Sequence, residues 1–239
     1  MDTVLTCHNI AVSFGELKAL SGVSFEVERN TVLGITGPNG AGKTTLLNVI
    51  SGSIKPTRGN VVMDGVDITG MKPNDVCHKG LARTFQIPVV FSSLSVSENV
   101  RVGTTFGKSK DQQTSEQILE QVGLRSKATS LSSDIDLYSK KLLMLAAALA
   151  TNPKLIFLDE PLGGLNIQEI DAFLETIRKL MTERGITILI IEHIFDKLVE
   201  ISDKMMILDH GKQIYLGEPE TAGNDPKVIE VYLGITKHA

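Results

Sequence analysis

The chain has 239 residues, of which 42% are hydrophobic and 22% are charged, and its formal net charge is -4. This composition is typical of a globular protein that buries a substantial core, and one domain with a subdomain is favoured over two separate domains. The acidic balance and the lack of a block of basic residues argue against a nucleic-acid partner.

Neither a membrane span nor a cysteine-based site is expected. The longest apolar run, Leu142 to Ala150, is too short to cross a bilayer, and the first residues lack the basic region of a secretory signal. Cys7 and Cys77 have neither C-x-x-C nor histidine-pair spacing, which gives no support to a disulfide framework or a zinc site. We therefore expect two thiols in a reducing compartment, and any membrane role must pass through a partner.

The amino-terminal part of the chain, residues 3–35, is predicted to form strands. Apolar and polar residues alternate from Val23 to Glu28, as in an antiparallel sheet with one solvated face. Phe14, next to Gly15, is by itself more typical of a core residue than of a ligand contact. A further strand and turn follow at residues 59–69, where Asp64-Gly65 is a hairpin signal.

A phosphate-binding loop is predicted between the apolar run Val32 to Ile35 and a helical pattern that ends near Ile50. It fits G-x-x-x-x-G-K-[ST] and reads Gly37-Pro38-Asn39-Gly40-Ala41-Gly42-Lys43-Thr44-Thr45. The glycines let successive backbone N–H groups converge on an anion, and the positive end of the following helix points to the same place. Lys43 adds a charge for the outer phosphates, and the Thr44 hydroxyl can ligate magnesium. A glycine turn that merely joins a strand to a helix is the alternative, which the flanking elements disfavour.

The middle of the chain is predicted to be mainly helical. A short helix begins at Pro73 and ends near Gly80, a strand runs from Leu81 to Gln86, and the proline-interrupted segment after it suits a packed loop. Residues 97–151 read as helices, with Lys140 to Ala150 rich in Leu and Ala. We expect a helical subdomain, approximately residues 87–151, inserted in an α/β core.

Two buried strands are predicted after this block, because Lys154 to Glu160 and Ile186 to Ile191 are almost uniformly apolar. The helix between them, Ile167 to Arg184, is expected to bury Ile170, Phe173, Leu174, Ile177 and Met181. A hairpin that turns at Asp209-His210-Gly211 and a short helix from Pro226 to Leu233 complete the chain.

The first of these strands ends on two carboxylates, Asp159 and Glu160. Open α/β sheets bind their ligands at the carboxyl ends of strands, so Asp159 is the expected second anchor of magnesium, through water or directly. Glu160 can polarise an attacking water. The alternative is that an acidic pair simply ends a strand, and the presence of Lys43 favours the functional interpretation.

Together these motifs resemble the ATP-binding cassette subunit of ABC transporters, and the likeness covers nearly the whole chain. Gln86 in Arg83-Thr84-Phe85-Gln86 matches the family's glutamine loop, and His193 matches its switch histidine. Gly163 to Asn166 matches the dimer-contacting loop. Phe14 falls where the family stacks an aromatic ring on adenine, which reverses the interpretation of Phe14 as a core residue.

The resemblance implies an α/β fold of the P-loop NTPase type, in one cassette that spans residues 1–239. Its core sheet would be largely parallel, with an amino-terminal antiparallel β subdomain and the helical insertion. The implied cofactors are ATP and Mg2+. The implied site has Glu160, His193 and Gln86 as catalytic residues, Phe14 and residues 37–45 on the nucleotide, and Thr44, Gln86 and Asp159 on the metal.

Within the family the chain most resembles the ATPases of branched-chain amino-acid importers. Stretches that carry this likeness are Ser97-Glu98-Asn99-Val100, Gly164-Leu165-Asn166, Ile191-Glu192-His193 and Val228 to Gly234. The likeness implies ATP hydrolysis that powers import, at the cytoplasmic face of the cell membrane. The implied partners are integral membrane permease subunits, a second ATP-binding subunit and, indirectly, an extracytoplasmic solute-binding protein.

One departure from the family concerns its Leu-Ser-Gly-Gly-Gln signature, which presents backbone N–H groups and a serine to the terminal phosphate on the opposite subunit. The corresponding residues are Ile135-Asp136-Leu137-Tyr138-Ser139 or, shifted by two, Leu137 to Lys141, and neither register keeps a glycine. Asp136 at the serine position would repel a phosphate about 4 Å away by roughly 4 kcal/mol. We hypothesise an asymmetric heterodimer, in which this chain meets a competent signature from a different ATPase subunit.

Three other functions stay open to different degrees. A regulatory subunit that holds ATP with little turnover is favoured by the missing signature and opposed by Glu160 and His193. A soluble ABC-type ATPase not linked to transport is disfavoured by the single cassette and the acidic balance. A small GTPase is disfavoured because no Asn-Lys-x-Asp motif occurs.

Overall fold

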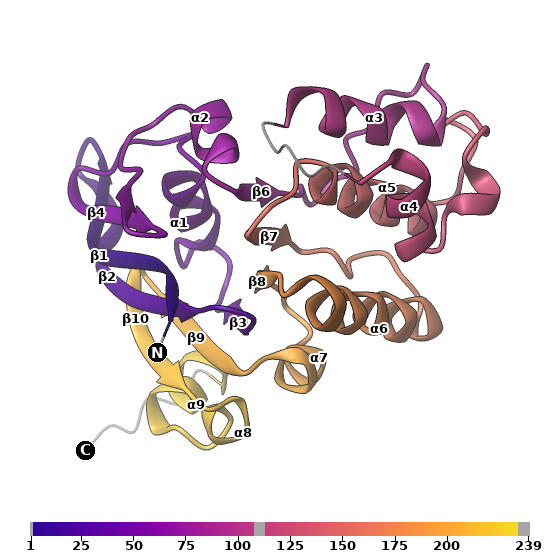
Figure 1. Ribbon diagram of the computed structural model, residues 1–239. Helices are drawn as coiled ribbons and strands as arrows, with labels where there is room; N and C mark the ends of the chain where they lie inside the picture. The colour runs from indigo at the N-terminus through magenta and orange to yellow at the C-terminus, as the bar shows by residue number, and fades with distance from the viewer. Residues whose placement is uncertain (1, 108–112, 234–239) are drawn as a thin grey trace. The chain divides into compact units, whose positions relative to one another are not determined.

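The computed structural model describes residues 2–107 and 113–233 (Figure 1). The chain divides into two compact units. Unit 1 comprises Met1–Val76 and Thr187–Ala239, and unit 2 comprises Cys77–Ile186.

Unit 1 contains two sheets and several short helices. Its strands are β1 (Thr3–Phe14), β2 (Leu17–Glu28), β3 (Val32–Thr36), β4 (Arg58–Met63), β5 (Val66–Asp67), β8 (Thr187–Ile191), β9 (Lys204–Asp209) and β10 (Lys212–Gly217). Its helices are α1 (Lys43–Ile50), α7 (Phe195–Ile201), α8 (Pro219–Ala222) and α9 (Pro226–Leu233). The boundary between the units falls within helix α2 (Pro73–His78), because unit 1 includes residues up to Val76 and unit 2 begins at Cys77.

The first sheet of unit 1 is antiparallel, with strand order β2-β1-β4-β5. Alternation along β2 is as predicted, since Val23, Phe25 and Val27 are buried while Ser24 and Glu26 are exposed. The antiparallel amino-terminal sheet is therefore confirmed.

The other sheet of unit 1 places β3 between β8 and β9, parallel to both, and β10 pairs antiparallel with β9. Both β3 and β8 are buried along their whole length. Helix α7 packs closely on β3, because a Cβ atom at Gly34 would lie 2.8 Å from the Leu198 side chain. Parallel strands end at the same edge of a sheet, so the residues that follow Thr36 and Ile191 emerge side by side.

Within residues 77–107 and 113–186, unit 2 has two strands and a set of helices. The elements are β6 (Leu81–Arg83), α3 (Val96–Phe106), α4 (Ser115–Gln121), a 3-10 turn (Arg125–Lys127), α5 (Leu137–Leu149), β7 (Leu155–Asp159) and α6 (Ile167–Arg184). Strand β6 pairs in parallel with β7. Helix α3 packs against both α4 and α5, as Figure 1 shows. Residues 87–151 thus contribute helices to a unit that also includes β6, β7 and α6.

Most predicted elements occur, with differences at their ends. The strand expected from Leu81 to Gln86 ends at Arg83, and the helix expected from Lys140 begins at Leu137 because the Asp136 side chain caps it. In α6, Leu180 rather than Met181 joins the buried face. Helices α7 and α8 were not predicted, since segments this short carry little periodicity. No helix within residues 2–107 and 113–233 is long and apolar enough to cross a membrane.

Candidate functional site

The glycine-rich loop of unit 1 joins the end of β3 to the start of α1, as the motif predicts. Two of its glycines are required by both conformation and space. Gly37 has φ 145°, and a Cβ atom there would lie 2.1 Å from the Leu208 carbonyl oxygen. Gly42 has φ 105°, and a Cβ atom there would lie 2.7 Å from the Ala19 carbonyl oxygen. A side chain at either position would force the loop away from β9 or β2.

Lys43 is the first residue of α1, and its side chain folds back over the loop. Its ammonium group donates hydrogen bonds to the carbonyl oxygens of Gly37, at 2.7 Å, and Pro38, at 3.0 Å. The residue is 6% exposed. Gly42 has no side chain that could cap α1, so the positive end of the helix dipole and the Lys43 ammonium both lie at the loop.

The remaining residues of the loop differ in their access to solvent. Ala41 is buried, Pro38 and Thr45 are half-buried, and Asn39, Gly40 and Thr44 are exposed. The Ala41 carbonyl oxygen accepts a hydrogen bond from the N–H of Gly211 at 2.9 Å. Contact with the turn between β9 and β10 therefore fixes the buried side of the loop, and its open side carries the Thr44 hydroxyl.

Phe14 ends β1 and pairs with Leu17 at the start of β2. Its side chain is not part of the core, because the residue is 51% exposed. From Leu17 the strand continues to Ala19, whose carbonyl oxygen would lie 2.7 Å from a Cβ atom at Gly42 of the loop. An exposed ring on the strand pair that borders the loop is consistent with contact to a planar base.

His193 follows β8 and is exposed, at the edge of the sheet where Gly37 also emerges. Its backbone N–H donates to the Glu192 carboxylate at 3.1 Å, and the Glu192 N–H donates to the Ile35 carbonyl oxygen at 3.2 Å. The structure therefore places His193 and the loop on adjacent strands of unit 1. Sequence reasoning gave no role to Glu192, although it is a carboxylate only 3% exposed.

In unit 2, Asp159 ends β7 and is 7% exposed. Its carboxylate accepts a hydrogen bond from the Arg83 guanidinium at 3.2 Å, and the same guanidinium lies 4.9 Å from the centre of the Phe85 ring. Burial lowers the pKa of Arg83, and the charge of Asp159 acts in the opposite direction. Sequence reasoning missed Arg83 as the partner of Asp159, because the two residues face each other only through the pairing of β6 with β7.

Gln86 and Glu160 lie together in unit 2, since the Gln86 side-chain amide donates a hydrogen bond to the Glu160 carboxylate. Glu160 has φ 45°, a left-handed conformation that costs a non-glycine residue roughly 1–2 kcal/mol. Its carbonyl oxygen accepts a hydrogen bond from the buried Lys141 ammonium at 3.4 Å. Such strain clusters at functional sites, where the surroundings fix it.

The family described as ABC transporter matches residues 20–163. The chain belongs to the ABC transporter family. Its ATP-binding proteins hydrolyse ATP, and this chain is therefore an ATPase that binds nucleotide.

Relatives match over nearly their full length. The chain is 32% identical to the high-affinity branched-chain amino acid transport ATP-binding protein BraF of Pseudomonas aeruginosa, over 97% of this chain and 98% of that protein. It is 35% identical to the probable branched-chain amino acid transport ATP-binding protein LivG of Methanocaldococcus jannaschii, over 97% of each.

Solved cassettes share the fold. The crystal structure of an ATP-binding cassette of an ABC transporter in its ADP conformation is 34% identical, has a TM-score of 0.88, and matches 98% of this chain and 100% of that one. A nucleotide-free ATP-binding cassette from an ABC transporter has a TM-score of 0.86 at 34% identity, with the same coverage. The predicted fold class is confirmed.

The segment of this ABC ATPase that departs from the family's signature caps helix α5. The Asp136 carboxylate accepts hydrogen bonds from the Ser139 N–H at 2.8 Å and from the Lys127 ammonium at 2.7 Å. The bond with Lys127 and the Ser139 N–H hold the pKa of Asp136 well below its usual range. Asp136 thus has a cationic partner that the sequence did not indicate, and the ion pair with Lys127 counteracts part of its negative charge.

The loop Gly163 to Asn166 of the cassette lies beside this segment within unit 2. A Cβ atom at Gly164, which has φ 79°, would lie 3.0 Å from the Leu137 side chain. Asn166 caps α6, in a capping box with Glu169. Residues 163–166 and the start of α5 are thus packed together.

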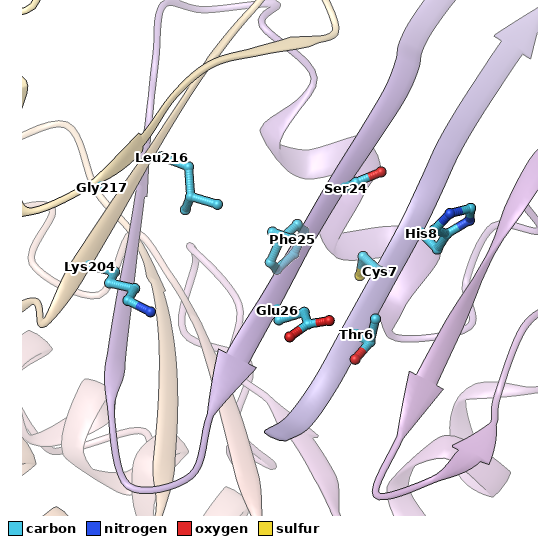
Figure 2. Close-up of a pocket in the computed structure, with 9 residues that line it drawn as sticks. All are labelled: Thr6, Cys7, His8, Ser24, Phe25, Glu26, Lys204, Leu216 and Gly217. Atoms are coloured by element: carbon cyan, nitrogen blue, oxygen red, sulfur yellow. The ribbon is translucent and has the colours of Figure 1, made fainter. Parts of the chain in front are cut away.

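A separate pocket of about 480 Å³ lies on the antiparallel sheet of unit 1 (Figure 2). Strands β1 and β2 supply most of its lining, with Lys204, Leu216 and Gly217 from β9 and β10. None of residues 37–45 lines it, so this pocket is separate from the glycine-rich loop.

Proposed function

We propose that this ABC ATPase powers the import of branched-chain or related amino acids through separate integral membrane permease subunits. It would lie at the cytoplasmic face of the cell membrane, and an extracytoplasmic solute-binding protein would deliver the solute to the permease. The names of BraF and LivG, matched over at least 97% of this chain, support the solute class.

From unit 1, the loop of residues 37–45 would bind the phosphates of ATP. Its N–H groups and Lys43 supply positive charge, and the Thr44 hydroxyl is an oxygen ligand of the kind that Mg2+ prefers. Phe14 would stack on adenine. His193 would hydrogen-bond the terminal phosphate and the attacking water.

From unit 2, the Asp159 carboxylate and the Gln86 carbonyl offer further oxygen ligands for Mg2+, and Arg83 orients Asp159. When bound, Mg2+ would neutralise charge that develops on the phosphates. Glu160 would polarise the attacking water. Its hydrogen bond with Gln86 and its strained backbone support this role, because both fix the direction of the carboxylate.

We further infer an asymmetric pair of ATPase subunits, and the observation that carries this inference is the cap of α5. In the family this helix start offers N–H groups to the terminal phosphate on the other subunit. Here Asp136 accepts the Ser139 N–H, and the bulky Tyr138 stands where the family has glycine. Since the chain supplies its own anion at this helix start, a phosphate would have to displace Asp136.

ATP turnover by the full chain, alone and mixed with candidate partner ATPases that co-purify with the permease, tests this inference. We expect slow turnover alone and faster turnover in the mixture. The variant Asp136→Ser with Tyr138→Gly restores two signature positions and should raise turnover of the chain alone, whereas Asp134→Ser, at an exposed neighbouring carboxylate, should not. Equal, brisk turnover by the unaltered chain alone would defeat the asymmetric pair.

A further inference from the structure

The carboxyl-terminal helix α9 reaches the base of the phosphate-binding loop within unit 1. The hydroxyl of Tyr232 lies 2.9 Å from the hydroxyl of Thr36, at hydrogen-bond distance. Thr36 is 1% exposed and is the last residue of β3, so it immediately precedes Gly37. Two residues separated by most of the chain therefore meet where the loop begins.

Tyr232 also contacts the first glycine of the loop. Burial raises the pKa of the Tyr232 hydroxyl, whereas hydrogen bonds with Thr36 and with the Gly37 backbone lower it. The carbonyl oxygen of Gly37 also accepts a hydrogen bond from the Lys43 ammonium group, at 2.7 Å. A single peptide segment is thus bound by the terminal helix on one side and by the phosphate-binding lysine on the other.

The ring of Tyr232 makes a second connection. It packs edge-to-face on Phe195, with the ring centres 6.1 Å apart and the planes at 71°. Phe195 is the first residue of α7 and follows closely after His193. Edge-to-face pairs contribute roughly 0.5–1.5 kcal/mol beyond area burial, which is enough to orient a partly exposed ring.

We propose that Tyr232 is a positioning residue of this ATPase: it fixes the start of the phosphate-binding loop through Thr36 and Gly37 and ties it to the segment after His193. The inference rests on the proposed role of residues 37–45 in binding ATP. It makes nucleotide affinity depend on helix α9, which lies outside the residues matched by the family.

The substitution Tyr232→Phe in the full chain tests the proposal, because it removes the hydroxyl and keeps the ring on Phe195. We expect the Kd for Mg-ATP, measured by calorimetry, to rise about three- to tenfold, as the loss of one or two neutral hydrogen bonds implies. The KM for ATP should rise with it, while kcat changes less than about twofold, because the hydroxyl does not touch the reacting atoms.

The matched control is Tyr215→Phe. The Tyr215 hydroxyl lies in the same unit and donates a hydrogen bond to the Glu218 carbonyl oxygen at 2.7 Å, which is not part of the loop. Loss of its hydroxyl removes a comparable hydrogen bond and should leave Kd unchanged. If Tyr232 has a merely structural role, Tyr232→Phe will lower the melting temperature, as Tyr215→Phe does, but will leave Kd as unchanged as the control does. That result would overturn the proposal.

The reciprocal variant, Thr36→Val, approaches the same contact from β3 and keeps the shape of a β-branched side chain. It should raise Kd, and the double variant with Tyr232→Phe should raise Kd by less than the two single effects combined, because both substitutions remove the same Tyr232–Thr36 hydrogen bond. Fully additive effects would overturn the proposal. Failure of the unaltered chain to bind Mg-ATP would instead refute the function of the loop itself, and this inference with it.

Discussion

Gln86 donates a hydrogen bond to the carboxylate of Glu160, although the two residues lie on different loops of unit 2. Gln86 follows β6 and Glu160 follows β7, and the parallel pairing of these strands brings the two loops together. The hydrogen bond aims the carboxylate, while Lys141 binds the carbonyl oxygen of the same residue. Glu160 is therefore fixed at both its side chain and its backbone.

Replacement of this carboxylate tests its chemical role. We expect Glu160→Gln to lower ATP turnover at least about 100-fold, because an amide cannot act as a general base, while Mg-ATP affinity stays within about twofold. Steady-state turnover and calorimetry of the assembled complex measure both quantities. Glu175→Gln, at an exposed position of α6, is the control and should leave turnover unchanged. Undiminished transport-coupled turnover in the Glu160 variant would favour a regulatory subunit that only binds ATP.

The two glycines at the start and middle of the loop should respond differently to alanine. A Cβ atom at Gly37 would collide with the Leu208 carbonyl oxygen, whereas one at Gly40, with φ 80°, would meet nothing within 4 Å. We expect Gly37→Ala to lower the free energy of unfolding by about 2–4 kcal/mol and Gly40→Ala by about 1–2 kcal/mol. Urea unfolding measures both, and equal losses would contradict this account of the loop.

The cap of α5 predicts a pH dependence of stability. The pKa of Asp136 is depressed in the folded chain relative to an unfolded value of about 3.9, so its stabilising contribution is present above that value and disappears as the pH falls through the folded pKa. We expect Asp136→Asn to be less stable at pH 7 by a few tenths to about 1 kcal/mol, because the ion pair with Lys127 is largely exposed and screened.

That difference should begin to shrink below about pH 4, where the carboxylate becomes protonated in the unfolded chain, and should vanish only in stronger acid, where Asp136 of the folded chain is protonated as well. Urea unfolding at several pH values measures it. Asp134→Asn, at an exposed aspartate outside the cap, provides the comparison. A stability difference that persisted unchanged in strong acid would show that Asp136 acts through its shape and not its charge.

The two thiols should differ in reactivity. Cys7 lines the pocket of Figure 2 but is 1% exposed, and burial raises the pKa of its thiol. Cys77 is half-buried: burial raises the pKa of its thiol as well, and a hydrogen bond with the Thr151 side chain acts in the opposite direction. We expect a Cys77→Ser variant to react with an aromatic disulfide reagent at least about 100-fold more slowly when folded than in urea. Rapid labelling of that folded variant would show that β1 opens locally.

Much of the fold was predictable because its signals are local. The glycines and Lys43 of the loop stand together in the sequence, and the apolar runs that form β3, β7 and β8 show their burial by composition. Strand and helix ends were less predictable. Helix α5 begins earlier than predicted, because the Asp136 side chain caps it, and the periodicity of apolar residues does not reveal a cap.

The sequence by itself determined the phosphate-binding motif, the acidic end of β7 and the alternation of strands and helices. Only the tertiary structure decided which charges are paired: Arg83 with Asp159, and Lys127 with Asp136. It also decided that Tyr232 meets Thr36. These contacts depend on strand register and on where helices such as α9 pack in the folded chain. A hydrogen bond also requires atomic positions accurate to a few tenths of an ångström, and the spacing of residues along the sequence does not encode such positions.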